Sequence, residues 1–600
     1  MKTTLKLWAL TILGLLFTQN SIASHVLGGD IKYIYLTPTK YKVVYKLYRE
    51  CSGVPLDLKQ VRFGVSSADG NVDATIVVTR TSIKDISLVC KKDTLPCDPN
   101  NTTTNSGTEE HIFESTVDFS QAPYSSIKSS SCKVLFYFSL CCRAGAVTTM
   151  SPGNFYLDAM VDFCAVKNIG NTSPIFKTLP LRNLCCNTPF SYNNGGIELA
   201  EGDSLSFEMA APLKGLNDPE TYTGSYDQNY PMTPYCPPTP GTLNCKPLPS
   251  AKPPRGFYFD KETGDVVFTP IKCDEGGVIA FKVNEWRKDS AGVWQIIGYV
   301  KRESTWFVQQ CTDNNAPYFT GNNRYSVCEG NKLCFTISSK DEAFLPQQTV
   351  SDTVQLTWDS GVVNATFRII DPTAREKQAE FCWQTKDGDA RASAYRFTAI
   401  STDNFCGAVG QTSKTYIISV KSKAKDKLVY KKLYKGGLEI FANPLNGSSG
   451  TSNTYKNIIR DSSNSGTPLY TSNNKQRDTF VFSSPGKYII EHQINNPPYN
   501  CPTFYYDTIT VTADDLTGII NYRKIDLNVY PNPSNGQISF NSSSIDVREA
   551  LIKVYAVDGK LVAEKQLQAG STDLSSLAKG IYTIEFKVEG YSVYRQLIIE

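Results

Sequence analysis

Short runs of alternating apolar and polar residues recur along the whole chain, and a helical repeat of apolar residues is almost absent. Runs such as "DIKYIYL" (residues 30–36), "KVLFYFSL" (133–140) and "NFYLDAMVDF" (154–163) are bounded by Gly, Pro, Asn and Asp. Such alternation predicts half-buried strands, and turn residues at intervals of roughly ten residues are typical of β-sandwiches. Abundant Tyr (33) and Phe (29) favour the same class, because aromatic rings suit pleated surfaces. The sequence therefore predicts an all-β chain of tandem sandwiches.

The first 23 residues have the form of a secretory signal peptide. Lys2 and Lys6 precede an apolar run over residues 7–17, and Ser21 and Ala23 supply the small residues of a cleavage site. Cleavage there would start the mature chain at residue 24, whereas the alternative is an uncleaved anchor. No other segment has enough consecutive apolar residues to span a bilayer, so no transmembrane helix is expected in the mature chain.

Cysteine usage agrees with export to an oxidising compartment. The chain has 18 cysteines and no C-x-x-C motif, which favours disulfides over zinc or thioredoxin-type sites. We expect most pairs to form inside single domains, with a connectivity that spacing alone does not give. Cys501 stands alone in its region, either free or paired across domains.

An internal repeat marks two domain starts. "NTSPIFKTLPLRNLC" begins at residue 171 and "NNAPYFTGNNRYSVC" at residue 314, with a proline, an aromatic residue and a cysteine at the same spacing in both. A proline at a strand start suits an edge strand and a fixed linker. The predicted organisation is a signal peptide at 1–23, sandwiches at 24–170, 171–312, 313–423 and 424–513, a linker at 514–526 and a small terminal sandwich at 527–600.

Two sandwiches resemble known repeat types. "FSSPGKYIIEHQI" (482–494) followed by "DTITVTA" (507–513) resembles a PKD-type immunoglobulin-like domain. "TDNNAPYF" (312–319) is similar to the linker between cadherin repeats, where Asp and Asn side chains bind calcium. The resemblance implies a weak calcium site at Asp313, the only carboxylate of the segment, and no other cofactor is expected.

A broader resemblance covers the region from residue 24 to about residue 311. "SHVLGGDIKYIYL", "CCRAGAVTTMSPGNFYLDAMV" and "GDSLSFEMAAPLKG" occur there in this order. Together they resemble the N-terminal region of large surface proteins of Bacteroidota, which often carry PKD repeats and gliding-motility-type labels. The resemblance implies a location and an architecture, and it does not name a ligand.

The last 74 residues resemble the C-terminal sorting domain of the type IX secretion system. The resemblance is carried by "LNVYPNPSNGQISF", "LIKVYAVDGKLVAEKQL", "LSSLAKGIYTIEFKVEG" and "YSVYRQLIIE". It implies that the type IX machinery is a partner and that the chain is exported to the outer face of the outer membrane. The alternative is a fifth ordinary sandwich. The sorting-motif residues are Tyr530, Pro531, Asn532, Pro533, Gly536, Asp558, Gly559, Gly580 and Tyr582.

Catalytic signatures are missing from the sequence. None of the three histidines follows a nucleophile motif, and phosphate-binding glycine loops do not occur. A net charge of +3 gives no basic face, so no nucleic-acid partner is expected. We therefore expect no enzyme but an adhesin or structural surface component, with a surface glycan or protein as the candidate ligand. Two alternatives stay open: a carbohydrate-active enzyme that uses a carboxylate pair, and a subunit of an extracellular filament or motility layer.

Overall fold

The computed structural model divides the chain into two compact units, Met1–Lys423 and Ala424–Glu600. It describes residues 25–600 except 52, 54, 57–58, 60, 89–94, 99–106, 168, 181–182, 198–202, 312, 406–408, 425, 434, 445–452, 474–475, 518–525, 544–545, 549 and 589–590. The predicted signal peptide lies outside the described residues. About 54% of the chain is strand and 3% is helix, which confirms the all-β class. The described helices are short: α2 (Tyr124–Ser130), α3 (Phe163–Val166) and α4 (Ala513–Thr517).

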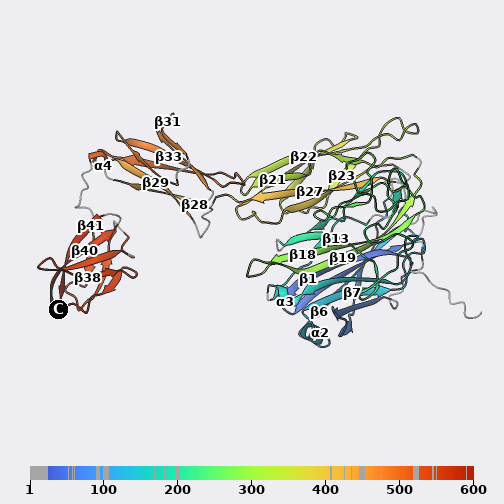
Figure 1. The fold of residues 1–600 in the computed structure, drawn as a ribbon, viewed down its shortest axis with the longest axis horizontal. Coiled ribbons are helices and arrows are strands. Elements are labelled where there is room, and N and C mark those ends of the chain that lie inside the picture. Colours follow the sequence, from blue (N-terminus) through green and yellow to red (C-terminus); the bar gives the residue numbers. More distant parts are fainter. Residues whose placement is uncertain are drawn as a thin grey trace, which may run out of the picture. The chain divides into compact units, whose positions relative to one another are not determined.

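A 14-stranded sheet forms the centre of the N-terminal unit (Figure 1). Its main path runs β4-β3-β7-β8-β19-β1-β2-β6-β5, with β10, β13, β14, β15 and β18 attached beside it. The strands of the main path are β1 (Val26–Thr37), β2 (Lys40–Glu50), β3 (Arg62–Ser67), β4 (Asp73–Thr75), β5 (Thr79–Asp85), β6 (Thr108–Asp118), β7 (Lys133–Leu140), β8 (Phe155–Asp162) and β19 (Trp294–Gln309). The attached strands are β10 (Asn183–Cys185), β13 (Ser204–Ala210), β14 (Leu213–Gly215), β15 (Asp218–Pro219) and β18 (Gly276–Lys288).

This sheet crosses the boundary that the sequence predicts at residue 170. β19 pairs with both β1 and β8, and it also forms a long antiparallel hairpin with β18. At Gly28 a side chain would overlap the Glu303 carbonyl, so glycine lets β1 lie directly against β19. Residues 24–170 and 171–312 therefore share one hydrogen-bonded sheet, a feature that no local pattern encodes.

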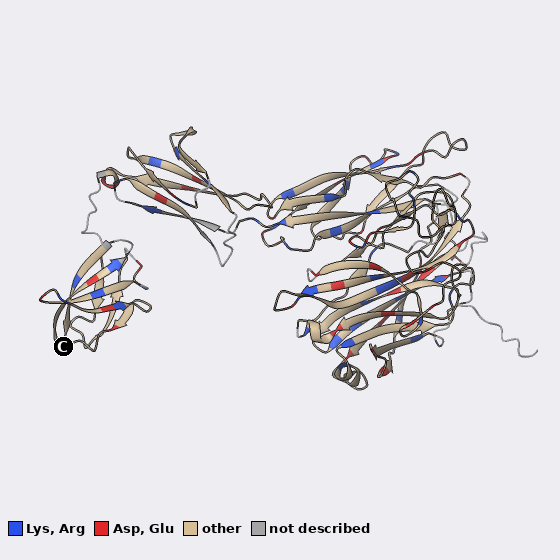
Figure 2. Cartoon of the chain, in the orientation of Figure 1, with Lys and Arg blue, Asp and Glu red and all other residues tan. Residues whose placement is uncertain are grey.

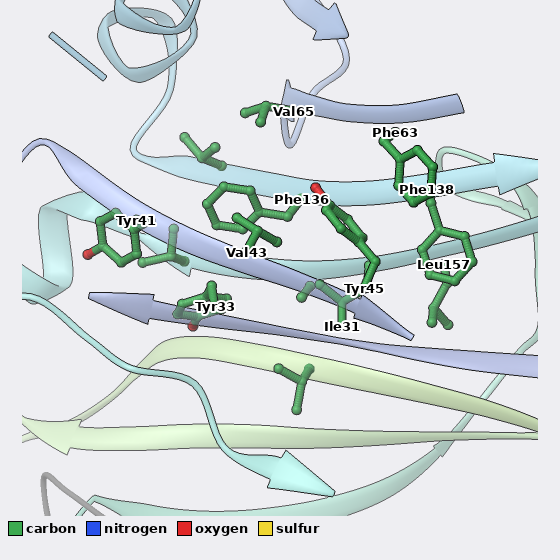
Figure 3. Packing of buried hydrophobic residues seen from close by; sticks show 14 of the residues in the cluster. Ile31, Tyr33, Tyr41, Val43, Tyr45, Phe63, Val65, Phe136, Phe138 and Leu157 are labelled. Carbon is green, nitrogen blue, oxygen red and sulfur yellow. The ribbon is translucent and has the colours of Figure 1, made fainter. Parts of the chain in front are cut away.

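Aromatic rings fill the core beneath this sheet (Figure 3). Tyr33, Tyr45 and Phe136 are each completely buried. Ring centroids lie 5.7 Å apart for Tyr33 and Phe136 and 5.1 Å apart for Tyr45 and Phe63. Tilted and edge-on ring pairs of this kind contribute about 0.5–1.5 kcal/mol each beyond area burial, which explains the Tyr- and Phe-rich composition.

A second, smaller core of the N-terminal unit packs around the buried Trp306. Phe190 and Tyr192 meet the Trp306 ring at 5.2 and 5.6 Å. Trp306 belongs to β19, whereas Phe190 and Tyr192 belong to β11 of the small sheet β11-β17-β16. The strands of the small sheets are β9 (Ile175–Phe176), β11 (Phe190–Tyr192), β12 (Gly196–Ile197), β16 (Tyr258–Phe259) and β17 (Val266–Phe268).

Residues 313–423 form a sandwich of two four-stranded sheets, in the orders β20-β22-β25-β24 and β21-β27-β26-β23. Its strands are β20 (Tyr318–Thr320), β21 (Arg324–Cys328), β22 (Lys332–Lys340), β23 (Gln355–Trp358), β24 (Ala365–Ile369), β25 (Lys377–Gln384), β26 (Tyr395–Thr402) and β27 (Gln411–Lys421). The sequence repeat has a structural counterpart here. β21 runs parallel to its closing strand β27, as β10 runs parallel to β19.

The C-terminal unit contains two further two-sheet sandwiches. The first has sheets β28-β29-β32 and β31-β30-β33-β34, and the second has sheets β35-β36-β39 and β38-β37-β40-β41. The first sandwich consists of β28 (Asp426–Lys432), β29 (Gly437–Pro444), β30 (Thr454–Asp461), β31 (Asn464–Asn473), β32 (Arg477–Val481), β33 (Gly486–Asn495) and β34 (Thr503–Val511). The second consists of β35 (Asn528–Tyr530), β36 (Gln537–Asn541), β37 (Leu551–Ala556), β38 (Leu561–Gln566), β39 (Ser571–Asp573), β40 (Gly580–Val588) and β41 (Tyr591–Ile599).

The disulfides whose two cysteines are both described join cysteines of the same predicted segment, as expected from the sequence. Cys501 is also disulfide-bonded rather than free. The pairs whose two cysteines are both described are Cys51–Cys97, Cys132–Cys164, Cys141–Cys142, Cys185–Cys311, Cys186–Cys273, Cys236–Cys245 and Cys334–Cys382.

Candidate functional site

The terminal sandwich has its own closed core, so residues 527–600 can act as a module. Ile552, Val554, Ile584 and Phe586 are completely buried, and Tyr582 is 8% exposed. Residues 582, 584 and 586 alternate along β40, so one face of this strand points into the core.

The Asn-Pro-Ser segment joins the first strand of this module to the last. Asn532 Nδ2 donates to the Gln596 carbonyl at 2.8 Å, and its Oδ1 accepts from the Ile598 amide at 2.9 Å. The Ser534 amide donates to the Ile598 carbonyl at 2.9 Å. Pro531 and Pro533 flank Asn532 and fix φ on both sides of it. These prolines and Asn532 therefore position the C-terminal strand β41.

Gly536 occupies a position that admits no side chain. Its φ is +108°, and a Cβ there would overlap the backbone N and Cα of Ser575. Its amide donates to Ser534 Oγ at 2.9 Å, and its carbonyl accepts from the Leu574 amide at 2.8 Å. Gly536 thereby brings the start of β36 into direct backbone contact with the segment after β39.

The remaining motif residues have different structural roles. Asp558 and Gly559 form the turn between β37 and β38, where Asp558 Oδ1 accepts from the Lys560 amide at 3.1 Å. Gly580 begins β40 opposite Ile599, and the Tyr582 hydroxyl donates to the Ala578 carbonyl at 2.7 Å. Tyr530 is half exposed at the end of β35. Of this set, Tyr530 alone presents a large ring to solvent.

One polar cluster on the outer face of this module was not singled out from the sequence. Glu585 accepts hydrogen bonds from the hydroxyls of Tyr555 at 2.7 Å, Ser592 at 2.6 Å and Tyr594 at 3.2 Å. The hydrogen bonds from Ser592 and Tyr555 hold the pKa of Glu585 below its usual range. The only signal in the sequence is that 555, 585 and 594 occupy solvent-facing positions of alternating strands.

The calcium site predicted from the sequence is at Asp313. Asp313 is exposed, whereas Asn314 is buried and donates through Nδ2 to Asp403 Oδ2 at 2.8 Å. Asn315 Nδ2 donates to the Glu342 carbonyl at 3.1 Å. Within the described residues, no three His, Cys, Asp or Glu side chains gather in a way that could hold a metal ion. The calcium site at Asp313 stays a prediction.

Asp403 should make the stability of the N-terminal unit pH-dependent. Burial raises its pKa to about 7, against hydrogen bonds from Asn314 and from the Gly410 and Phe405 amides. Nearby Asp341 has its pKa raised to about 6, also by burial. A raised folded pKa gives stability that is present below about pH 4 and is lost as the pH rises through about 7. We expect the midpoint temperature of thermal unfolding of this unit to be lower at about pH 8 than at about pH 5.

Thermal unfolding of the mature protein at both pH values checks this expectation. Asp403→Asn should flatten the dependence, since the amide keeps an acceptor for the Gly410 and Phe405 amides and does not titrate. Asp313→Asn is the matched control, because Asp313 belongs to the same junction but is exposed. An unchanged slope in Asp403→Asn would contradict the assignment.

The comparisons with known proteins identify the terminal module. Residues 528–600 match the family described as "Secretion system C-terminal sorting domain". This type IX sorting tail implies that the chain is secreted, that the type IX machinery handles it, and that it associates with the cell surface or outer membrane. None of the curated proteins compared with the chain matches it.

Two of the solved structures that align with this chain contain several domains each. Domains FN1–FN3 of chicken CNTN1 align at 11% identity and TM-score 0.18, covering 48% of this chain and 98% of that one. Domains EC1–4 of Drosophila N-cadherin align at 12% identity and TM-score 0.19, covering 76% and 93%. The fold class itself follows from the strands and sheets described above.

Among the residues that the structure describes, no helix has the length and apolar character needed to cross a membrane. Lys and Arg residues are interspersed with Asp and Glu over the strands, and they do not gather by sign in the view of Figure 2.

Proposed function

We propose that this chain is a cell-surface adhesin or structural surface component that the type IX secretion system exports. The observation that carries the proposal is the complete terminal sandwich at residues 527–600, which matches a sorting domain over residues 528–600. The disulfide-bonded sandwiches before it suit an extracellular scaffold. Loops on such a scaffold tolerate variation and are the expected contact surfaces.

The proposed route begins with cleavage of residues 1–23 at the inner membrane. The terminal module then carries the sandwiches across the outer membrane and is removed or exchanged for an anchor in the 514–526 segment, most of which lies outside the described residues. The boundaries at 312, 423 and 513 belong to this proposal, in which residues 24–312 share the sheet described above. The placement of the chain among the PKD-bearing, gliding-motility-type surface proteins of Bacteroidota is also part of this proposal.

Two other functions are the alternatives to adhesion. A carboxylate-dependent carbohydrate-active enzyme would release reducing ends when the purified mature protein is screened on polysaccharides. A filament or motility-layer subunit would appear as an assembly in size-exclusion chromatography with light scattering, whereas an adhesin of this kind would elute as a monomer.

A reporter fusion tests the export part of the proposal. Residues 518–600, fused to a periplasmic reporter in a host with a type IX system, should send the reporter to the cell surface. The matched control carries the same fusion with Gly536→Ala. Whole-cell binding of the purified mature protein tests the adhesion part, and absence of binding to any cell or matrix surface would leave only the structural role.

A further inference from the structure

A pocket of about 590 Å³ opens within the N-terminal unit, between the β11–β17 sheet and the sandwich of residues 313–423. One wall comes from residues 188–191, from the loop 249–254, and from Asp265 and Val267 of the β16–β17 hairpin. The other wall comes from residues 315–319 and from β27. The volume lies in the range of small-ligand sites, about 300–1,000 Å³.

Hydrogen bonds fasten the two walls to each other. Thr415 Oγ1 donates to Asp265 Oδ1 at 2.8 Å, and Ser191 Oγ donates to the Ser413 carbonyl at 3.1 Å. The Asn193 amide donates to Ser413 Oγ at 2.6 Å. The pocket is therefore preformed, and a ligand would not have to order its walls on binding.

The walls present flat rings and short hydroxyl side chains. Tyr318 is 38% exposed, and Phe190 and Phe319 line the pocket beside it. Hydroxyls of Thr188, Ser191 and Ser250 also line it. Ring faces pack against C–H groups, and hydroxyls exchange hydrogen bonds with hydroxyls. The proline rings of the lining are Pro189, Pro249, Pro253, Pro254 and Pro317.

The lining holds two carboxylates, Asp265 and Glu342, and two ammonium groups, Lys252 and Lys414, so its formal charge balances, and the two kinds of group differ in the partners that they already have. Asp265 is occupied by Thr415 and by Asn193 Nδ2 at 2.8 Å, and Glu342 accepts from the Tyr318 hydroxyl at 2.8 Å. Lys414 Nζ donates only to the Gly321 carbonyl, at 3.3 Å, and neither Lys414 nor Lys252 has a carboxylate partner within ion-pair distance among the described residues. A half-buried ammonium without such a partner is stabilised by an anionic ligand group.

The same walls suit a peptide poorly. An extended peptide usually adds to a strand edge through main-chain hydrogen bonds. Pro189 and Pro317 stand at or next to the starts of β11 and β20 and have no N–H to donate. Three further prolines remove donors from the 249–254 loop. The pocket must therefore recognise its ligand mainly through ring faces, hydroxyls and ammonium groups.

We propose that this pocket binds an acidic oligosaccharide, a chain of uronic acid units whose ring faces pack on Tyr318 and the prolines and whose carboxylate pairs with Lys414 and Lys252. The site names the ligand class of the adhesin proposed above, and in that sense it rests on that function.

Titration of the purified mature protein with defined tetrasaccharides tests the site. The probes are tetramers of galacturonate, mannuronate and guluronate, a neutral galactose tetramer, and a hexapeptide of glutamate. At least one uronate tetramer should bind at least tenfold more tightly than the neutral tetramer, with an affinity that falls as salt is raised. Equal binding of acidic and neutral sugars, or no binding of any uronate, would overturn the proposal. Tighter binding of the glutamate peptide would also overturn it in favour of an acidic protein segment.

Three variants of lining residues and one control variant test whether the ligand binds in this pocket. Lys414→Gln and Tyr318→Ala should each weaken uronate binding about tenfold, and Lys332→Gln, an exposed lysine outside the lining, should not change it. Lys252→Gln is the second charge variant, because Lys252 is exposed and its loss does not threaten folding. Unchanged affinity in both Lys414→Gln and Lys252→Gln would place the ligand elsewhere.

The same variants separate the pocket from the broader function. If the wild-type protein adheres to cells and Lys414→Gln adheres equally well, the adhesin proposal stands and the pocket proposal fails. If the protein binds uronate in solution but adheres to no surface, the pocket stands and the adhesin proposal fails.

Discussion

Replacing Gly536 by alanine should strongly destabilise the terminal sandwich and reduce export. The new Cβ would overlap the Ser575 backbone, and φ at this residue is +108°. The unfavourable φ and the steric overlap together should cost about 2–5 kcal/mol. That is a large fraction of the stability of a small domain, commonly about 5–15 kcal/mol. The N-terminal unit should keep its own unfolding transition.

Gly559→Ala is the matched control for this prediction. Gly559 also has a positive φ, +83°, but no atom lies within 4 Å of a Cβ placed there. Gly559→Ala should lower the free energy of unfolding by only about 1 kcal/mol, because it changes the backbone conformation alone. Calorimetry of the purified chain from residue 24 to residue 600 measures both changes, and surface labelling of cells measures export. Equal effects of the two substitutions would show that the contact with Ser575 is not important.

Asp30→Ala should strongly destabilise the N-terminal unit. Asp30 and Arg302 are 4% and 1% exposed, and Asp30 Oδ2 accepts from Arg302 Nε at 3.0 Å and from Nη2 at 2.6 Å. The Tyr48 hydroxyl donates to the same oxygen at 2.5 Å. Removing the carboxylate leaves a buried guanidinium without its counter-charge, which typically costs about 3–5 kcal/mol.

Asp118→Ala provides the comparison on the same sheet. Asp118 pairs with Lys40 at 3.3 Å, with the two side chains 25% and 49% exposed, and it accepts from the amide and hydroxyl of Ser120 at the exposed end of the strand. Ion pairs at the surface contribute about 0–1 kcal/mol. Denaturant unfolding of the mature protein should therefore shift far more for Asp30→Ala than for Asp118→Ala. Similar shifts would mean that water reaches Arg302 or that the sheet rearranges around it.

The parts of the fold that depend on local pattern could be predicted from the sequence. Alternating runs at residues 30–36, 133–140 and 154–163 predicted strands, and these residues lie in β1, in β7, and in β8 with the start of α3. The pairing of β1 with β19 could not be predicted in this way. Asp30 and Arg302 are 272 residues apart, and each side chain taken alone indicates an exposed charge. Their burial follows only from the meeting of two distant strands.

The candidate sites show the same difference between local and distant information. The motif residues of the terminal module lie within 75 residues of one another, so their order along the chain was informative. Asp313 was predicted to bind calcium because it is a carboxylate in a linker. The neighbouring Asn314, however, has a buried partner, Asp403, that lies 89 positions away in the sequence. The pocket is lined by several separate segments, and no one of them carries a recognisable motif.

We propose that residues 527–600 are an export address and not a working part of the surface protein. The most direct test is the location of a chain that ends at residue 526, measured by protease treatment and surface labelling of intact cells. The truncated chain should stay in the periplasm as a folded, disulfide-bonded protein, protected from external protease, while the full chain reaches the surface. If the truncated chain arrives at the surface at the full-length level, residues 527–600 are not an export address and form one more sandwich.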